Sequence, residues 1–308
     1  MASVSTTSQD DIKTAQAGLV AGIFCYATWG VLPLLFKVLD GVPSPTIVAN
    51  RSLWSLVLVS VIIVAIGRLA EVRTALADPA TLRSMLISSL LLGCNWLIFV
   101  YAIENHKALE ASFGYFINPL MNVAIGVVFF GERQNRWQVA SIALATIAIL
   151  IQAVALGTIP VIALGLALTF AAYAYFRKTA KVTSVTGLFI ETAFMAPVAA
   201  AYLVYTFARD GGIGPHADPA TLGLLMLTGA GTTLTLLLFA FSVQRIRMTT
   251  VGMLQYISPS IQFVMAITVF GEHLGPVGLV SFGLIWVSLM IFTADSFARR
   301  RAAAVEPA

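Results

Sequence analysis

The chain has 308 residues, of which 59% are hydrophobic and only 10% are charged, and its mean hydropathy is +0.91. A soluble domain carries about 25% charged residues, so this composition excludes an ordinary water-soluble protein and favours a chain that lies in a lipid bilayer. The net charge of +4 comes from Lys and Arg residues scattered singly between apolar runs, a pattern that anchors helices at lipid headgroups rather than binding nucleic acid.

Apolar runs long enough to cross about 30 Å of hydrocarbon occur ten times along the chain. They are expected at residues 17–39, 46–66, 80–103, 110–130, 137–156, 158–176, 183–206, 220–243, 249–270 and 275–294. The joints between them are short, as in GVPSP at 41–45. Because the alternation of period two that a membrane β-barrel requires is absent, the sequence predicts an all-α integral membrane protein with ten transmembrane helices.

The basic residues predict which side of the membrane each joint occupies. If the N-terminus is inside, the inner flanks hold fourteen Lys and Arg residues, whereas the outer flanks hold three, Lys37, Lys107 and Arg209. Cytoplasmic loops carry an excess of basic residues. We therefore expect both termini to be cytoplasmic.

The two halves of the chain repeat at an offset of 140 residues. ADPATL at 77–82 recurs at 217–222, and INPLMNVAIGVVFFGE at 117–132 aligns with ISPSIQFVMAITVFGE at 257–272. Five spans in each copy force the two copies to cross the membrane in opposite directions, which predicts the inverted repeat of many secondary transporters. The expected divisions are an N-terminal tail at 1–16, a first five-helix repeat at 17–156, a second at 157–296 and a C-terminal tail at 297–308.

The repeated motifs have structural interpretations. In both copies of ADPATL, the aspartate is the predicted N-cap and the proline takes the first helical position. Gly131 and Gly271 suit helix C-termini, and Glu132 and Glu272 are expected just before the next helix, where a negative charge is favoured. A proton-coupling role for these two glutamates is the alternative.

The expected substrate cavity lies where two polar stripes meet. The stripes share the spacing i, i+3 and i+7, and they consist of Tyr115, Asn118 and Asn122 and, 140 residues later, Gln255, Ser258 and Gln262. Pro119 and Pro259 each remove one backbone donor and weaken their helix, which points to a binding site in an inverted repeat. Interhelical hydrogen bonds that only hold the bundle together are the alternative.

Two further kinds of residue belong to this expectation. Asn95 and Trp96 add an amide and an aromatic ring that suits planar substrates, with plain packing as the alternative for Trp96. Arg51 and Glu191 are charges inside spans and are repeat mates, separated by roughly 10 Å or more along the membrane normal. They are expected to form structural ion pairs or a gate with other partners, namely Glu110 or Glu104 for Arg51, and Arg245 or Arg247 for Glu191.

Several stretches resemble the RarD branch of the EamA transporters, within the drug/metabolite transporter superfamily. They include NRSLWS (50–55), NWLIFVYAI (95–103), LEASFGYFINPL (109–120), RIRMTTVGMLQYISPS (245–260) and FGLIWVSLMIF (282–292). The resemblance covers nearly the whole chain. It implies a ten-helix permease of the bacterial inner membrane that moves small metabolites or drugs by alternating access, with amino-acid-like or aromatic compounds and export as expectations.

No enzyme motif competes with this interpretation. The sequence contains neither H-E-x-x-H nor G-x-S-x-G, and its three histidines lack metal-ligand spacing, so no catalysis, metal or cofactor is expected. A sensor would need longer loops. The expected partners are a small-molecule substrate, the lipid bilayer and a proton as coupling ion, in a monomer or homodimer. An uncoupled facilitator or channel-like uniporter stays open as the alternative.

Overall fold

The computed structural model describes residues 9–39, 41–157, 160–211, 218–268 and 275–305. These residues are almost entirely helical and contain no strand. The helices are α1 (Gln9–Val31), α2 (Pro33–Val38), α3 (Ser44–Ala65), α4 (Leu69–Ala77), α5 (Pro79–Glu104), α6 (Ala108–Phe130), α7 (Arg136–Leu156), α8 (Val161–Thr179), α9 (Ser184–Asp210), α10 (Pro219–Val243), α11 (Met248–Gln255), α12 (Ile257–Thr268) and α13 (Pro276–Val305).

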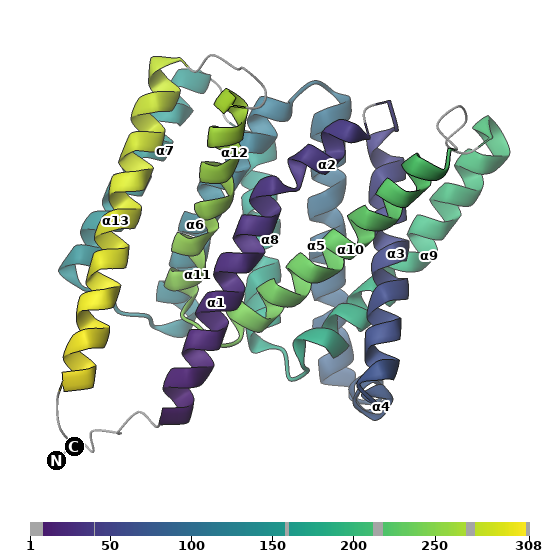
Figure 1. Ribbon diagram of the computed structural model, residues 1–308, viewed down its shortest axis with the longest axis horizontal. Helices are drawn as coiled ribbons and strands as arrows, with labels where there is room; N and C mark the ends of the chain where they lie inside the picture. The colour runs from purple at the N-terminus through teal and green to yellow at the C-terminus, as the bar shows by residue number, and fades with distance from the viewer. Residues whose placement is uncertain (1–8, 40, 158–159, 212–217, 269–274, 306–308) are drawn as a thin grey trace.

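The long helices run between two ends of one bundle, and the first residues of α1 and the last residues of α13 lie at the same end, the lower one in Figure 1, which is therefore the end that carries the termini of the described chain. Within the described residues, nine helices are long and apolar enough to cross a membrane. Together with the composition, they identify the chain as a multi-pass membrane protein.

The segment expected as a single span at 249–270 differs from the prediction. It forms two helices, α11 and α12, which meet at Tyr256 and follow one another from the lower to the upper end of the bundle (Figure 1). Pro259 lies just inside α12, where it lacks a backbone N–H to donate, whereas its repeat mate Pro119 lies inside the unbroken α6. The two prolines therefore do not have the same effect on their helices.

The first predicted span also differs in detail. It begins at Gln9, earlier than the expected residue 17, and it is divided into α1 and α2 just before Pro33. A proline in a helix interior clashes with the preceding turn, which accounts for a division at this point. The short helix α4 at the lower end was not expected from the apolar runs.

The helix ends confirm the predicted caps. Asp78 is the N-cap of α5 and accepts hydrogen bonds from the backbone N–H groups of residues 80 and 81, and Asp218 does the same for α10. Gly131 ends α6 in the left-handed conformation, with φ of 61°. Gly271 and Glu272 lie outside the described residues.

Three glutamates cap helices that are distant in the sequence. Glu71 accepts the Thr183 N–H of α9 at 3.0 Å, and Glu110 accepts the Ile162 N–H of α8 at 2.8 Å. Burial raises the pKa of Glu71, but hydrogen bonds from Thr183, Arg68 and Thr186 outweigh it and hold this pKa below its usual value.

Glu132, expected at the N-terminus of the following helix, caps α11 instead. Its carboxylate accepts the N–H groups of Met248 at 2.6 Å and Thr249 at 2.9 Å. The α7 N-terminus is served by Asn135 and Gln138, which form a capping box. The Glu132 carboxylate therefore stabilises the N-terminus of α11 at the end of the bundle.

The helices pack in a set of extensive pairs, which are α1 with α10 and α12, α3 with α9 and α10, α5 with α8 and α9, α6 with α8 and α11, and α7 with α13. The α1–α10 pair uses Gly18 and Gly22. A Cβ on Gly18 would lie 2.7 Å from the Arg245 Cβ, and one on Gly22 would lie 2.7 Å from the Ser242 Oγ. These glycines therefore serve packing inside the subunit.

Candidate functional site

A cavity of about 360 Å³ lies between α1, α3, α5, α6, α8, α10 and the α11–α12 junction. Nine of the residues singled out from the sequence line it: Arg51, Asn95, Trp96, Tyr115, Asn118, Gln255, Ser258, Pro259 and Gln262. The apolar part of the lining includes Tyr26, Trp29, Phe99, Leu166 and Phe170. The two polar stripes thus face one shared space, together with aromatic rings.

Three of the expected residues do not line the cavity. Asn122 is fully buried and donates a hydrogen bond to the Gln255 Oε1 at 2.5 Å, so it holds α6 against α11. Pro119 lies inside α6 without reaching the space, and Glu191 lies elsewhere. The hydrogen bond to Gln255 favours the alternative interpretation for Asn122, in which it holds two helices together.

The polar lining residues differ in how far the protein satisfies them. Asn95 donates to the Leu166 carbonyl at 2.9 Å and to the Thr169 Oγ1 at 3.0 Å, and Gln262 donates to the Ser258 Oγ at 3.3 Å. The Asn118 Oδ1 is buried and has no hydrogen-bond partner in the described structure. An unpartnered buried acceptor is costly, and it is free to receive a donor from a bound molecule.

Residues that stand 140 positions apart in the sequence also occur together in the lining of the cavity. Six pairs of residues that stand 140 positions apart both contribute to the cavity: Tyr26 and Leu166, Leu92 and Thr232, Asn95 and Thr235, Trp96 and Leu236, Tyr115 and Gln255, and Asn118 and Ser258. Equivalent positions of the two halves therefore converge on one space.

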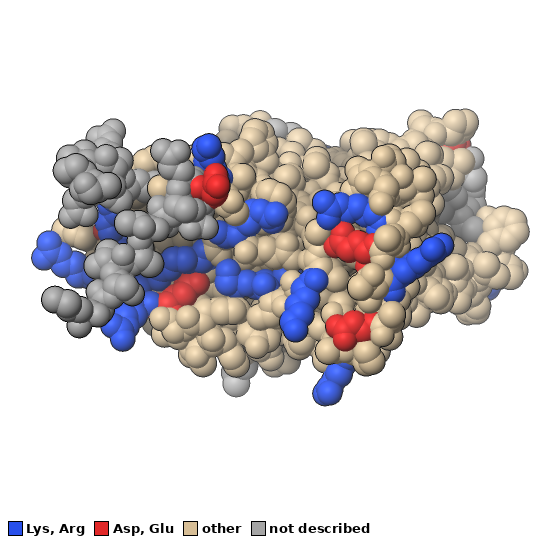
Figure 2. All heavy atoms as spheres, turned by 90° about the horizontal axis from the view of Figure 1, so that it is seen from below, with Lys and Arg blue, Asp and Glu red and all other residues tan. Residues whose placement is uncertain are grey.

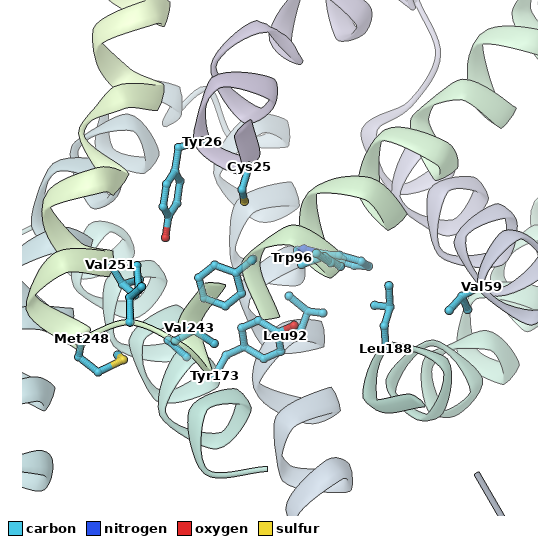
Figure 3. Packing of buried hydrophobic residues seen from close by; sticks show 14 residues of the cluster. Cys25, Tyr26, Val59, Leu92, Trp96, Tyr173, Leu188, Val243, Met248 and Val251 are labelled. Carbon is cyan, nitrogen blue, oxygen red and sulfur yellow. The ribbon is translucent and has the colours of Figure 1, made fainter. Parts of the chain in front are cut away.

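Aromatic rings form the floor of the cavity on the side of the termini. The Trp29 ring lies 5.7 Å from the Phe170 ring, and the Phe170 ring lies 5.1 Å from the Phe239 ring. Below them, Tyr173 stacks on Phe239 with ring centroids 5.7 Å apart. Figure 3 shows Tyr173 with Val243 on the lower side of this core. The floor separates the cavity from the end of the bundle that carries the termini.

A polar network closes that same end of the bundle. Lys178 donates to the carbonyl groups of Val243 at 3.0 Å and Ile246 at 2.6 Å, at the C-terminus of α10. Gln134 donates to the Thr249 Oγ1 at 2.7 Å beside the Glu132 cap. Towards the other end, the lining residues Ser112 and Tyr115 are exposed.

The expected ion pair between Arg51 and Glu110 is wrong. The Arg51 guanidinium carbon lies 4.1 Å from the centroid of the Trp96 ring, which is a cation–π contact, and Glu110 is engaged at the N-terminus of α8. The side chain of Glu104, the other expected partner, lies outside the described residues. Arg51 therefore belongs to the cavity wall, a role that its position inside a span did not reveal.

The expected partners of Glu191 are also wrong. Glu191 pairs with Arg177 at 3.5 Å, and both side chains are fully buried. The Ser88 hydroxyl and the Tyr173 hydroxyl also donate to its carboxylate. Arg245, in the turn after α10, instead donates to the Phe241 carbonyl of α10, and Arg247 lies 3.6 Å from Glu132.

Sequence reasoning missed Arg177 because it was counted among the basic residues of the inner flank. A signal was present, since Arg177 lies in the last turn of α8 and Glu191 lies two turns into α9, so that both fall near the same end of the bundle. Residues of α5, which packs against α8 and α9, complete the site: Met85 contacts Arg177, and Ser88 contacts Glu191.

The chemistry that this arrangement supports is binding. No group of three or more His, Cys, Asp or Glu side chains able to hold a metal ion occurs in the part of the chain that the structure describes. The cavity offers rings, neutral amides and hydroxyls and one guanidinium, which suits a small molecule with an apolar body.

The chain is similar over nearly its whole length to known proteins. Residues 16–154 match the EamA-like transporter family. The chain is 38% identical to "Protein RarD" of Escherichia coli (strain K12) over 94% of its own length and 98% of that protein. It is 39% identical to an "Uncharacterized transporter" of Vibrio cholerae serotype O1 over 95% of its length and 97% of that protein.

A more distant relative and a solved structure agree with these matches. The chain is 27% identical to the "Chloramphenicol-sensitive protein RarD" of Pseudomonas aeruginosa over 92% of its length and 96% of that protein. A protein known from its crystal structure superposes with a TM-score of 0.69 at 16% identity, covering 89% of this chain and 96% of the other. At this identity the likeness concerns the fold alone.

Proposed function

The chain belongs to the EamA-like transporter family, on its RarD branch, and from this premise we propose that it is a secondary transporter that moves small molecules across the bacterial inner membrane by alternating access. The substrate binds in the cavity between the two halves, and these halves, residues 17–156 and 157–296, are inverted five-helix repeats. Membership of a transporter family at this level of identity makes a membrane-embedded enzyme or a sensor the weaker alternative.

One observation carries the proposal: six pairs of equivalent residues from the two halves line the same cavity. In transporters built from inverted repeats, the substrate site lies near the midplane at the interface of the repeats. A cavity that belonged to one half alone would not draw on matched positions in this way.

The packing of the helices supports the same symmetry. For this comparison, α11 and α12 are taken as one crossing, which gives ten crossings in all. When each crossing is exchanged for its equivalent in the other half, α1–α10 becomes α5–α8, α1–α12 becomes α6–α8, and α3–α10 becomes α5–α9. The remaining pairs, α3–α9, α6–α11 and α7–α13, exchange into themselves.

The accessibility of the cavity supports alternating access. Its exposed lining residues, Ser112 and Tyr115, lie nearer the end away from the termini, and the aromatic floor and the polar network around Lys178 and Glu132 lie on the other side. With the termini in the cytoplasm, this arrangement corresponds to an outward-facing state.

The orientation is proposed from the distribution of charge. Figure 2 shows many Lys and Arg side chains over the lower end of the bundle, as the positive-inside rule predicts for a cytoplasmic surface. We expect reporter fusions at residue 180 and at the C-terminus to be cytoplasmic and one at residue 212 to be periplasmic. Residue 212 lies outside the described residues. A cytoplasmic signal at 212 would contradict both the orientation and the inverted repeat.

Removing the polar groups of the cavity should impair transport more than folding. We expect Asn118→Ala and Gln262→Ala to lower transport severalfold at near-normal membrane abundance, because each side chain lines the cavity and the Asn118 Oδ1 has no protein partner to lose. Compounds retained by a deletion strain in an export screen would supply the substrates for flux assays in proteoliposomes.

Ser141→Ala provides the matched control for these variants. Ser141 and Ser288 share a buried hydrogen bond of 2.9 Å between α7 and α13, away from the cavity. Its loss should lower abundance first and transport only in proportion. If Asn118→Ala and Gln262→Ala follow the pattern of Ser141→Ala instead, the polar stripe is structural and the binding role is wrong.

An uncoupled facilitator is the second candidate, and one observation favours it. No Asp, Glu or His lines the cavity in the described part of the chain, whereas proton-coupled transporters use such groups inside the membrane. Flux measured with and without a pH gradient separates the two: a rate that is independent of the gradient supports the facilitator. The expectation of proton coupling stays a prediction that this assay decides, and export stays a prediction that the export screen tests.

A further inference from the structure

The cavity wall carries one charged side chain in the described part of the chain, and that charge is positive. The guanidinium carbon of Arg51 lies 4.1 Å from the centroid of the Trp96 ring, and its Nε is buried without a hydrogen-bond partner. A ring face attracts a cation but accepts no strong hydrogen bond, and a guanidinium has five N–H donors to satisfy. The Arg51 guanidinium therefore packs against a ring but does not have hydrogen-bond acceptors for all of its N–H groups.

Glu191, the equivalent charged residue in the second half, has protein partners that compensate its charge. Glu191, which stands 140 residues after Arg51, meets Arg177 at 3.5 Å and accepts hydrogen bonds from the hydroxyls of Ser88 and Tyr173, with no access to the cavity. The fold therefore compensates the intramembrane acid internally. Arg51, the positively charged equivalent, lies instead at the surface of the cavity, where a bound molecule can reach it.

The rest of the lining determines what such an occupant can be. Trp29, Trp96, Phe99, Tyr115 and Phe170 supply rings, and the other polar contributors are neutral amides and hydroxyls. No carboxylate faces the cavity within the described residues. An ammonium group in this space would lose its hydration without gaining a counter-ion, and it would be repelled by Arg51.

We propose that the cavity selects small organic anions, with a carboxylate bound by the Arg51 guanidinium and a planar apolar body packed against Trp96 and the neighbouring rings. The planar fork of arginine matches a carboxylate with two parallel hydrogen bonds while its face stays stacked on the indole. Cationic and zwitterionic compounds of the same shape are discriminated against. This inference rests on the proposed function, because it names the substrate class of the same cavity.

A series of probes that differ in the head group alone tests the selection. The probes are 3-phenylpropionate as the anion, 3-phenylpropanamide as its neutral counterpart, 3-phenylpropylamine as the cation and L-phenylalanine as the zwitterion. Binding to the full-length protein in detergent is measured by calorimetry. The propionate should bind at least about tenfold more tightly than the amide, since a hydrogen bond to a charged partner is worth more than a neutral one. The amine should bind most weakly.

Variants of Arg51 assign the selectivity to this side chain. Arg51→Gln should bind the propionate and the amide alike, whereas Arg51→Lys should keep a preference for the propionate because it keeps the charge. Arg83→Gln removes an exposed arginine of α5 outside the cavity and should behave as the wild type. Thermal unfolding of each variant reports whether it is folded. If Arg51→Gln does not fold, the wild-type series and Arg51→Lys decide the result.

Two results would overturn the proposal: equal binding of the anion and the amine or zwitterion by the wild type, or an unchanged preference for the anion in a folded Arg51→Gln. Flux in proteoliposomes separates this failure from that of the proposed function. An anion that binds through Arg51 but is never moved contradicts transport and leaves the anion selectivity standing. An amine that the wild type moves well contradicts the anion selectivity and leaves transport standing.

Discussion

Arg177→Met is expected to lower the free energy of unfolding by about 3–5 kcal/mol, because it leaves the buried carboxylate of Glu191 without its counter-ion. Both side chains are fully buried, and Arg177 also donates to the Ser184 carbonyl at 3.1 Å. Methionine fills much of the same space without a charge, so the loss is electrostatic rather than a loss of volume. Membrane abundance and the thermal midpoint in detergent are the measurements.

A double-mutant cycle with Glu191→Gln isolates the ion pair. Once the carboxylate is neutral, the arginine has no charge to compensate, so the double variant should be more stable than the sum of the two single changes predicts. Lys181→Met removes an exposed cation four residues further along the chain and should change stability by less than about 0.5 kcal/mol. Additive effects in the cycle would contradict the pair.

Gly252→Ala is expected to destabilise the protein by about 1–3 kcal/mol and to reduce transport, because no space exists for a side chain at this crossing. A Cβ on Gly252 would lie 2.5 Å from the Pro119 carbonyl oxygen and 3.2 Å from the Val123 Cγ2. The helix α11 would have to move away from α6, and with it would move Gln255, which lines the cavity and accepts the hydrogen bond of Asn122. The thermal midpoint and the transport rate should therefore fall together.

Gly93→Ala is the matched control, since the same methyl group is added to a membrane helix where space is available. The nearest atom to a Cβ at this position is the Met195 Cε at 3.8 Å, an ordinary contact. Alanine is the better helix former, so this variant should be as stable as the wild type or slightly more so. Equal melting temperatures for Gly93→Ala and Gly252→Ala would show that α6 and α11 do not approach as closely as described.

The positions of the long helices and most of the cavity were predictable from local patterns. A membrane span is recognised by its length and apolar composition, since the hydrocarbon thickness sets both. The polar stripe around Asn118 and its equivalent around Ser258 were predicted to face the interior because exposing such groups to lipid is costly, and all of their residues except Asn122 line the cavity. The 140-residue offset then indicated that the two stripes belong together.

The partners of individual polar groups were not predictable in the same way. Arg51 was expected to meet Glu110 or Glu104, and Glu191 was expected to meet Arg245 or Arg247. The contacts that the structure shows for Arg51, Glu110, Glu191, Arg245 and Arg247 lie elsewhere. A hydrogen bond or an ion pair depends on distances of a few tenths of an ångström between helices that are remote in the sequence. Periodicity gives the face of a helix on which a residue lies, but not the rotation of the neighbouring helix.

The sequence by itself thus determined that this chain crosses a membrane many times, where most of its long helices begin, and which polar side chains face inward. These features follow from the cost of exposing charges and backbone groups to hydrocarbon, which acts on each segment separately. Only the tertiary structure decided that Asn122 serves packing, that Arg177 neutralises Glu191 and that Arg51 stands on Trp96 at the cavity wall. Those outcomes depend on how the helices cross, because a buried polar group is satisfied by whichever partner the packing brings within reach.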